Sequence, residues 1–112
     1  MPDTDTVLHV RVGALVLRSP LIAASGTCGF GEELEEIGVT AALGALVTKT
    51  ITREPREGNP PPRICETSAG LINSIGLANP GWDRFRREIL PRLERLGCPC
   101  VVNIGGKTDE EY

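Results

Sequence analysis

Hydrophobic and polar positions alternate at the start of the chain and then give way to short continuous apolar runs. Residues 8–12 (Leu-His-Val-Arg-Val) alternate, and an apolar segment at residues 14–17 follows Gly13. This pattern predicts a β-hairpin that turns near Gly13. Three later runs are almost entirely apolar, which is typical of strands buried on both faces. They are residues 21–24 (Leu-Ile-Ala-Ala), 45–48 (Ala-Leu-Val-Thr) and 100–102 (Cys-Val-Val).

Two segments between these runs carry a helical period. Residues 32–37 form a short helical pattern, and Gly38 is the expected C-terminal cap. The second segment starts at Asn79-Pro80 and ends at Gly97, and Pro91 within it predicts a kink or two short helices. Apolar residues that recur every three or four positions give this second segment one hydrophobic face. They are Trp82, Phe85, Ile89, Leu93 and Leu96.

The order of these elements predicts the fold class. A hairpin is followed by strand, helix, strand, long loop, helix and strand, and this alternation indicates a parallel α/β sheet. Another helix is expected to begin at Thr108 or Asp109, close to the last residue, Tyr112. A (β/α)8 TIM barrel needs roughly 250 residues. We therefore expect residues 1–112 to be the truncated N-terminal portion of one barrel domain, with the N-terminal hairpin closing its bottom.

The long connection after the second apolar run is the most informative segment. About twenty loop-like residues follow Lys49, and in a compact domain a loop of this length is usually functional or disordered. A simple linker would not need apolar anchors, which this loop and the segment after it contain. We therefore predict an active-site loop. The expected anchors are Ile64, Leu71, Ile72, Ile75 and Leu77.

Composition narrows the location and the partners. The formal net charge is −3, so there is no reason to expect nucleic acid or an anionic membrane as a partner. No apolar run approaches the roughly 20 residues of a membrane span. Residues 1–7 (MPDTDTV) are acidic and polar, unlike a secretory signal. A cytoplasmic location is the default expectation.

The cysteines and the single histidine argue against a metal centre. Without a secretory signal, the four cysteines are expected to be reduced thiols. Cys98 and Cys100 form a C-x-C pair, which differs from the C-x-x-C of zinc and redox motifs. His9 is the only histidine, and nothing in the sequence brings it near a nucleophile for a Ser-His-Asp triad. We expect no metal site.

Each apolar run ends in polar residues at its carboxyl end. Ser25 follows the first run, Lys49 and Thr50 follow the second, and Asn103 follows the third. The carboxyl ends of barrel strands converge on one active-site face, so these residues should meet in space. A lysine at the end of a buried strand needs an anion or a polar partner.

Neutral amides suggest the kind of ligand. Asn73, Asn79 and Asn103 each donate and accept hydrogen bonds, which suits a ring with alternating N–H and C=O groups, such as a pyrimidine or a flavin. Lys49 adds a fixed positive charge for a carboxylate or for a flavin. No carboxylate pair stands out for acid–base chemistry, and the glutamates of the long loop, Glu54, Glu57 and Glu66, are expected to be solvated. The glycines at 26–31 lack the spacing of a dinucleotide-binding fingerprint.

Four motifs follow one another along the chain: PLIAASGTCGFG (20–31), ALVTKTITREPREGNPPPRICE (45–66), GLINSIGLANPG (70–81) and VVNIGG (101–106). Together they resemble the class 1 dihydroorotate dehydrogenases, and most of all the catalytic subunit of the NAD-linked subtype, class 1B. The resemblance covers nearly the whole chain, from about Leu8 to Gly106. The order and spacing of these motifs make the match specific.

The resemblance implies an FMN-containing barrel that oxidises (S)-dihydroorotate to orotate in pyrimidine biosynthesis. Ser25, Lys49, Thr50 and Asn103 match FMN-contacting positions, and Lys49 also matches a position that reaches the substrate. The segment Asn73, Ser74, Ile75, Gly76 and Leu77 matches the orotate-binding loop. In the family a cysteine is the catalytic base, and its position lies beyond Tyr112, so no catalytic residue is expected in this chain.

The subtype also implies partners. A partner subunit that carries FAD and a [2Fe–2S] cluster is expected to pass on the electrons. The full-length protein is expected to be a homo-oligomer, whereas the 112 residues alone are expected to be inactive.

Two alternatives remain open at this stage. One is a related FMN barrel that acts on pyrimidines, of the dihydropyrimidine dehydrogenase type. The other is a binding role for the proline-rich stretch 54–63, which would offer a polyproline II segment to a partner domain.

Overall fold

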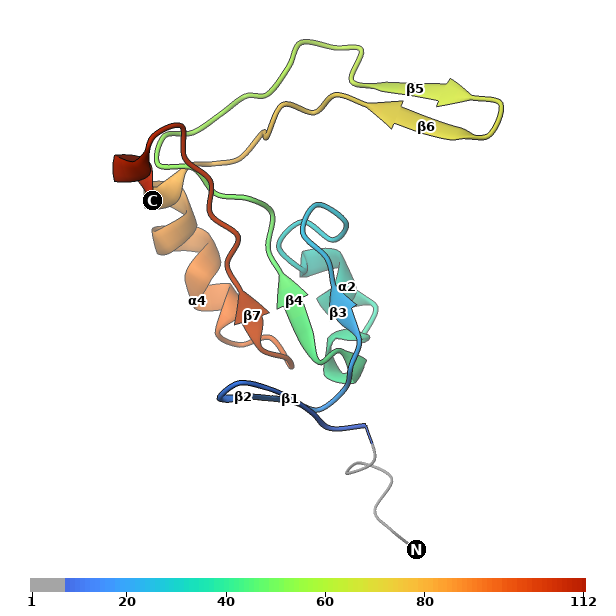
Figure 1. The fold of residues 1–112 in the computed structure, drawn as a ribbon, viewed down its shortest axis with the longest axis vertical. Helices are drawn as coiled ribbons and strands as arrows, with labels where there is room; N and C mark the ends of the chain where they lie inside the picture. The colour runs from blue at the N-terminus through green and yellow to red at the C-terminus, as the bar shows by residue number, and fades with distance from the viewer. Residues whose placement is uncertain (1–7) are drawn as a thin grey trace, which may run out of the picture.

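A three-stranded parallel sheet forms the centre of the fold (Figure 1). The computed structural model describes residues 8–112, so the prediction about a secretory signal in residues 1–7 lies outside the described residues. The strands are β3 (Ile22–Ala23), β4 (Ala45–Val47) and β7 (Cys100–Val101), in the order β3-β4-β7. All three predicted strands are confirmed, and so is their parallel arrangement.

The predicted N-terminal hairpin is also confirmed. It consists of β1 (Val10–Val12) and β2 (Leu15–Leu17), which pair antiparallel. The turn contains Gly13 with a φ of 59°, a left-handed conformation that glycine adopts at little steric cost. In Figure 1 the hairpin lies across the amino ends of the sheet strands, at the opposite end from the long connection.

Helical segments follow the first two sheet strands of the chain. Helix α2 (Glu32–Glu36) is followed by Gly38 with a φ of 73°, and the N–H of Gly38 donates to the carbonyl of Glu35 at 3.0 Å. This is the glycine stop that the sequence predicted. A short 3-10 turn, η1 (Thr40–Ala42), then leads into β4.

The sequence predicted a kink or two short helices at Pro91; the second helical segment is instead continuous and changes its helical pitch just ahead of Pro91. It runs as α3 (Trp82–Arg84), a π-helical turn η2 (Phe85–Ile89) and α4 (Leu90–Leu93). Proline has no N–H to donate to the preceding turn, so a change of helical pitch there is expected. The helix begins after Gly81 and not at Asn79-Pro80, and it ends at Leu93, earlier than the predicted Gly97.

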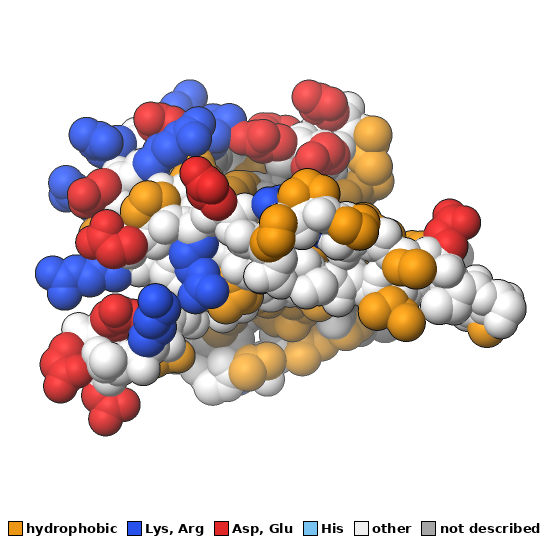
Figure 2. Space-filling view, turned by 90° about the horizontal axis from the view of Figure 1, so that it is seen from above, with side chains coloured by type: hydrophobic (Ala, Val, Ile, Leu, Met, Phe, Trp, Pro, Cys, Tyr) orange, Lys and Arg blue, Asp and Glu red, His pale blue; other side chains and the backbone are white. Residues whose placement is uncertain are grey.

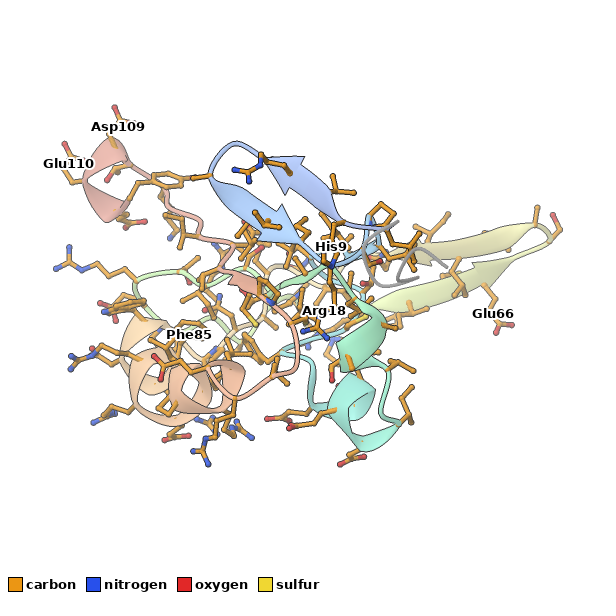
Figure 3. All side chains as sticks on the ribbon, turned by 90° about the horizontal axis from the view of Figure 1, so that it is seen from below. His9, Arg18, Glu66, Phe85, Asp109 and Glu110 are labelled. Carbon is orange, nitrogen blue, oxygen red and sulfur yellow. The ribbon has the colours of Figure 1, made fainter. Side chains whose placement is uncertain are left out.

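The hydrophobic core lies between this helical segment and the sheet. Phe85 is fully buried and points towards the sheet (Figure 3), with its ring centroid 5.9 Å from that of Phe30. Leu46 on the central strand is also fully buried, and Ile89 and Leu93 pack with it. Trp82, at the start of the predicted apolar face, remains 43% exposed.

Burial on both faces is confirmed only for the central strand. Ala45, Leu46 and Thr48 are buried, whereas Ile22 on β3 is 48% exposed and Val101 on β7 is 44% exposed. The prediction was wrong for β3 and β7 because only one face of these strands is covered. Ala23 and Cys100 are in register with Leu46 and pack against the core, whereas Ile22 and Val101 lie on the opposite face of the sheet.

The long connection contains a second hairpin that the sequence did not predict. It consists of β5 (Ile64–Thr67) and β6 (Gly70–Asn73), paired antiparallel, and it stands away from the carboxyl end of the sheet (Figure 1). The proposed anchors do not anchor it to the core. Ile64, Leu71 and Ile72 are about three-fifths exposed, because neither face of the hairpin packs on the sheet.

The described chain ends in a short helical turn. This is η3 (Asp109–Glu111), a 3-10 turn preceded by Thr108, which confirms that a helical element begins there. Across residues 8–112, no helix has the length and apolar character needed to cross a membrane.

Candidate functional site

Polar side chains from the ends of all three sheet strands meet at one point. The amide Nδ2 of Asn103 donates to the Oγ of Ser25 at 2.8 Å and to the Oγ1 of Thr50 at 2.9 Å. The backbone N–H of Asn103 also donates to Thr48 Oγ1, at 3.1 Å. The prediction that the strand ends converge is therefore confirmed for Ser25, Thr50 and Asn103.

Continued parallel pairing beyond the strands explains why these residues meet. Past β4 and β7 the two segments stay hydrogen-bonded: Ile51 donates to the carbonyl of Asn103 at 2.8 Å, and Gly105 donates to that of Ile51 at 2.9 Å. This register fixes Thr50 beside Asn103 although 53 positions separate them in the chain. The geometry of the cluster therefore depends on sheet pairing, with no need for a local motif.

Lys49 lies beside this cluster and lines an open hollow of about 510 Å³. The backbone of Lys49 is fixed, because its N–H donates to the carbonyl of Gly29 at 2.9 Å. Within residues 8–112 the ammonium group forms no ion pair. The other lining residues come from the first strand end, the β5–β6 hairpin and the segment after it: Gly26, Ile64, Leu71, Asn73, Ile75, Gly76 and Leu77.

Most of the segment predicted to bind substrate faces this hollow. Asn73, Ile75, Gly76 and Leu77 line it, and Ser74 does not. The hydroxyl of Ser74 instead accepts a hydrogen bond from Asn59 Nδ2 at 2.7 Å. In Figure 2, which looks onto this end of the sheet, hydrophobic side chains follow the hairpin while charged side chains gather over the other half.

Backbone donors are available along the same segment. In the described part of the chain, the N–H groups of Ile75, Gly76 and Leu77 have no hydrogen-bond acceptor. Leu77 has a φ of 56°, which is unusual for a residue with a branched side chain. A lysine next to consecutive unpaired N–H groups suits a flat anion that is rich in acceptor oxygens.

The sequence analysis missed a second layer of polar contacts behind this segment. The side chain of Asn59 donates to Ser74 O, and the backbone carbonyl of Arg63 accepts from the N–H of Ser74 at 2.8 Å. Thr52 hydrogen-bonds to Asn79, just after the segment. Asn79 was predicted to suit a ligand ring, but its amide is buried and used entirely within the protein. Antiparallel pairing between Arg56 and Asn79 brings the proline-rich stretch next to the end of the segment. No pattern in the sequence predicts this pairing.

The described residues offer no acid–base pair at the hollow. Glu54, Glu57 and Glu66 are exposed, as predicted, and Glu66 lies on the projecting hairpin (Figure 3). Burial raises the pKa of the Cys98 and Cys100 thiols, so both stay protonated at neutral pH. Between residues 8 and 112, no group of three potential ligands among His, Cys, Asp and Glu could hold a metal ion.

Comparison with known proteins identifies the family of this chain. Residues 7–112 match the sequence model of dihydroorotate dehydrogenase, so the chain belongs to the dihydroorotate dehydrogenase family. Among its relatives are subunits named dihydroorotate dehydrogenase B (NAD(+)), catalytic subunit. The one from Desulforudis audaxviator is 54% identical over 103 residues, which is 92% of this chain and 34% of the relative. The one from Carboxydothermus hydrogenoformans is 53% identical over 105 residues, 94% of this chain and 34% of the relative.

Solved structures extend the similarity to the arrangement of the elements. The ligand-free dihydroorotate dehydrogenase of Eimeria tenella aligns with a TM-score of 0.69 at 28% identity, over 99% of this chain and 34% of that one. The same enzyme in complex with ferulenol aligns with a TM-score of 0.64 at 28% identity, over 93% of this chain and 30% of that one. The chain thus spans about a third of the length of the curated relatives it matches.

Proposed function

We propose that the whole protein oxidises (S)-dihydroorotate to orotate and that residues 1–112 are the N-terminal portion of its single FMN-binding (β/α)8 barrel domain. The observation that carries the proposal is the joint position of two features. The Ser25–Asn103–Thr50 cluster closes the carboxyl end of the sheet, and the hollow with Lys49 opens directly beside it. Barrel enzymes carry their active sites at this end of the strands.

The cluster fits FMN as a cofactor. Ser25, Lys49, Thr50 and Asn103 would hold it, since two hydroxyls, an amide and an ammonium can serve both the donor and the acceptor positions of an isoalloxazine ring. The bound flavin would supply a two-electron acceptor. These four residues would orient the ring, and Lys49 would place a positive charge next to it.

The hollow fits the substrate. Dihydroorotate is a small ring with two carbonyl oxygens and a carboxylate. Lys49 would pair with negative charge on this ligand, while the free N–H groups of Ile75, Gly76 and Leu77 would donate to its oxygens. Asn73 and Ser74 complete the proposed loop. Apolar groups of Ile64 and Leu71 would limit the access of water.

The catalytic base is expected in the part of the protein that follows Tyr112. Within this chain, Cys98 and Cys100 have raised pKa values and lie outside the hollow, so neither suits the removal of a proton. We therefore assign binding and orientation, but no proton transfer, to these residues.

The B-type relatives support an NAD-linked electron path. These relatives are named catalytic subunits, which fits a second subunit as the electron-transfer partner. We propose that this partner carries FAD and a [2Fe–2S] cluster. A homo-oligomer of the full-length protein, without a nucleic-acid or membrane partner, and a cytoplasmic location complete the proposal.

Two measurements on the full-length protein test the proposed function. Purified protein should be yellow, with a flavin absorption band at about 450 nm, and should reduce its flavin when dihydroorotate is added without oxygen. A preparation that takes up no FMN would contradict the cofactor assignment. Faster reduction of the flavin by dihydrouracil than by dihydroorotate would favour the dihydropyrimidine dehydrogenase type. The relatives named dihydroorotate dehydrogenase favour dihydroorotate.

The proline-rich stretch has a role inside the fold that makes a separate ligand function unnecessary. The backbone of Arg56 pairs with Asn79, and the N–H of Asn59 donates to the carbonyl of Ile75 at 3.0 Å. A stretch held in this way supports the proposed substrate segment. Binding of the free peptide 54–63 to an SH3-type domain would revive the alternative.

A further inference from the structure

The carbonyl groups of the proposed substrate segment are tied to the protein while its N–H groups are left free. Ser74 O accepts from Asn59 Nδ2 at 3.2 Å, and Leu77 O accepts from Asn79 Nδ2 at 2.8 Å. Ile75 O accepts from the backbone N–H of Asn59. Within residues 8–112 the N–H groups of Ile75, Gly76 and Leu77 have no acceptor. One edge of the segment is therefore anchored and the other is available to a ligand.

The amide of Asn79 is fixed in one orientation. Its Oδ1 accepts from the N–H of Gly81 at 2.9 Å and of Thr52 at 3.2 Å, while its Nδ2 donates to Leu77 O and to Thr52 Oγ1, the latter at 2.9 Å. A flipped amide would set its NH2 against two backbone donors and its oxygen against a carbonyl. Because Asn79 is only 8% exposed, water cannot replace these partners.

The contact from Asn79 acts on the one strained residue of the segment. Leu77 has a φ of 56°, and a left-handed conformation costs a non-glycine residue about 1–2 kcal/mol. A hydrogen bond to the carbonyl of Leu77 stabilises that conformation. Without this bond, the peptide groups on either side of Leu77 would be free to turn towards the ordinary region.

Asn59 holds the other end of the segment from the solvent side. Its side chain is exposed, yet its Nδ2 reaches both the carbonyl and the hydroxyl of Ser74. Gly76 packs so closely that an added Cβ would lie 2.6 Å from the backbone nitrogen of Asn59. The guanidinium of Arg63 donates to the backbone carbonyl of Glu57 at 2.9 Å and to that of Asn59. These two bonds stabilise the backbone that carries the Asn59 side chain.

We infer that Asn59 and Asn79 are positioning residues that hold the carbonyl groups of Ser74, Ile75 and Leu77 and thereby keep the N–H groups of residues 75–77 available to the substrate. The inference rests on the proposed function, because it takes dihydroorotate or orotate as the ligand. Neither side chain lines the hollow, so both act through the backbone between them.

The test replaces each amide by the carboxyl group of the same shape in the full-length holoprotein. Asn59→Asp and Asn79→Asp keep an oxygen acceptor, lose the Nδ2 donor and gain a negative charge. Both are therefore measured at high salt, which screens the charge at the exposed position 59. We expect the Kd for orotate, read from the flavin spectrum, and the KM for dihydroorotate to rise about five- to tenfold, as a lost hydrogen bond predicts. The kcat should fall less than about twofold, since binding lost equally from the ground state and the transition state leaves kcat unchanged.

A matched destabilised variant separates positioning from general loss of structure. Leu93→Val shortens a buried side chain in the core away from the hollow, so it should lower the thermal midpoint and leave the Kd for orotate unchanged. FMN content should stay at the wild-type level in all three variants. A rise in Kd for Leu93→Val equal to that of the aspartate variants would overturn the positioning role.

Exposure makes Asn59→Asp decisive if Asn79→Asp does not fold. A wild-type Kd for orotate in Asn59→Asp would then contradict the inference by itself. Failure of the proposed function looks different, because the unsubstituted protein would neither bind orotate nor oxidise dihydroorotate. Normal activity with unaffected aspartate variants would remove only the role of the two asparagines.

Discussion

At the scale of single residues, the sequence predicts which side chains lie at the carboxyl end of the sheet. It does not predict which hydrogen bonds they form with one another. Ser25, Thr50 and Asn103 were expected there because each follows an apolar run. Their mutual hydrogen bonds depend on strand register, which apolar runs of three or four residues do not specify. Asn79 illustrates the limit, since an amide that suits a ligand equally suits a buried backbone site.

The shared amide gives a prediction for cofactor binding. Asn103→Ala removes the donor to both Ser25 and Thr50, and we expect the Kd for FMN to rise about tenfold, equivalent to about 1.4 kcal/mol. Fluorescence titration of the apo form of the full-length protein with FMN measures it. Thr27→Ala is the control, because this exposed hydroxyl lies beside the same strand end but contacts only its neighbours in the chain, Ala24 O at 2.7 Å and Cys28 Sγ at 3.3 Å. Equal Kd values for the two variants would contradict the cofactor role of Asn103.

At the scale of elements, regular apolar periods were enough for the sheet and the helices. The hairpin β5–β6 was not predicted, because its two-residue turn, Ser68-Ala69, lacks the Asn-Gly or Asp-Gly signal of tight hairpins. Its strands also carry apolar side chains on both faces, so no polar–apolar alternation marks them. The long connection is therefore an antiparallel arm with the proposed substrate segment at its base.

The close packing at the base of this arm gives a second prediction. Gly76→Ala would place a Cβ 2.6 Å from the nitrogen of Asn59 at a φ of 79°, so the two stretches must separate. We expect the Kd of the full-length variant for orotate to rise at least tenfold and its free energy of unfolding to fall by about 1–3 kcal/mol.

Gly70→Ala is the matched control in the same arm, because an added Cβ there meets nothing within 4 Å. It should change the free energy of unfolding by less than about 0.5 kcal/mol. Isothermal titration with orotate and urea unfolding measure the two effects. Equal losses in both variants would show that the close approach at Gly76 is unimportant.

At the scale of the whole molecule, the described chain exposes surfaces that a finished domain would cover. The radius of gyration is 16.5 Å, against about 13 Å expected for a compact domain of this length. Ile22 and Val101 are exposed on the two edge strands, and Leu21 is exposed just before β3. A chain that spans a third of its relatives' length accounts for both features, because the remaining strands and helices would pack on these faces.

This exposure predicts the behaviour of residues 1–112 when they are made alone. We expect a molten or aggregating species that binds a hydrophobic dye and melts without a cooperative transition, because unpaired edges and bare apolar faces favour association. Calorimetry and dye fluorescence test this, with the full-length protein as control. A sharp, reversible thermal transition of the 112 residues would show that the partial sheet is stable by itself.

The contact between Ser25 and Asn103 also sets an order of events in time. These residues are 78 positions apart, so no local search brings them together, and closing so long a loop carries an entropic cost that sheet pairing must offset. During synthesis the first two strands leave the ribosome well before Asn103 exists as part of the chain. The cluster of Ser25, Thr50 and Asn103 can therefore form only after residue 103 has been added to the chain. It forms when β7 pairs with β4, so its hydrogen bonds are present only when the third strand of the sheet is in the correct register.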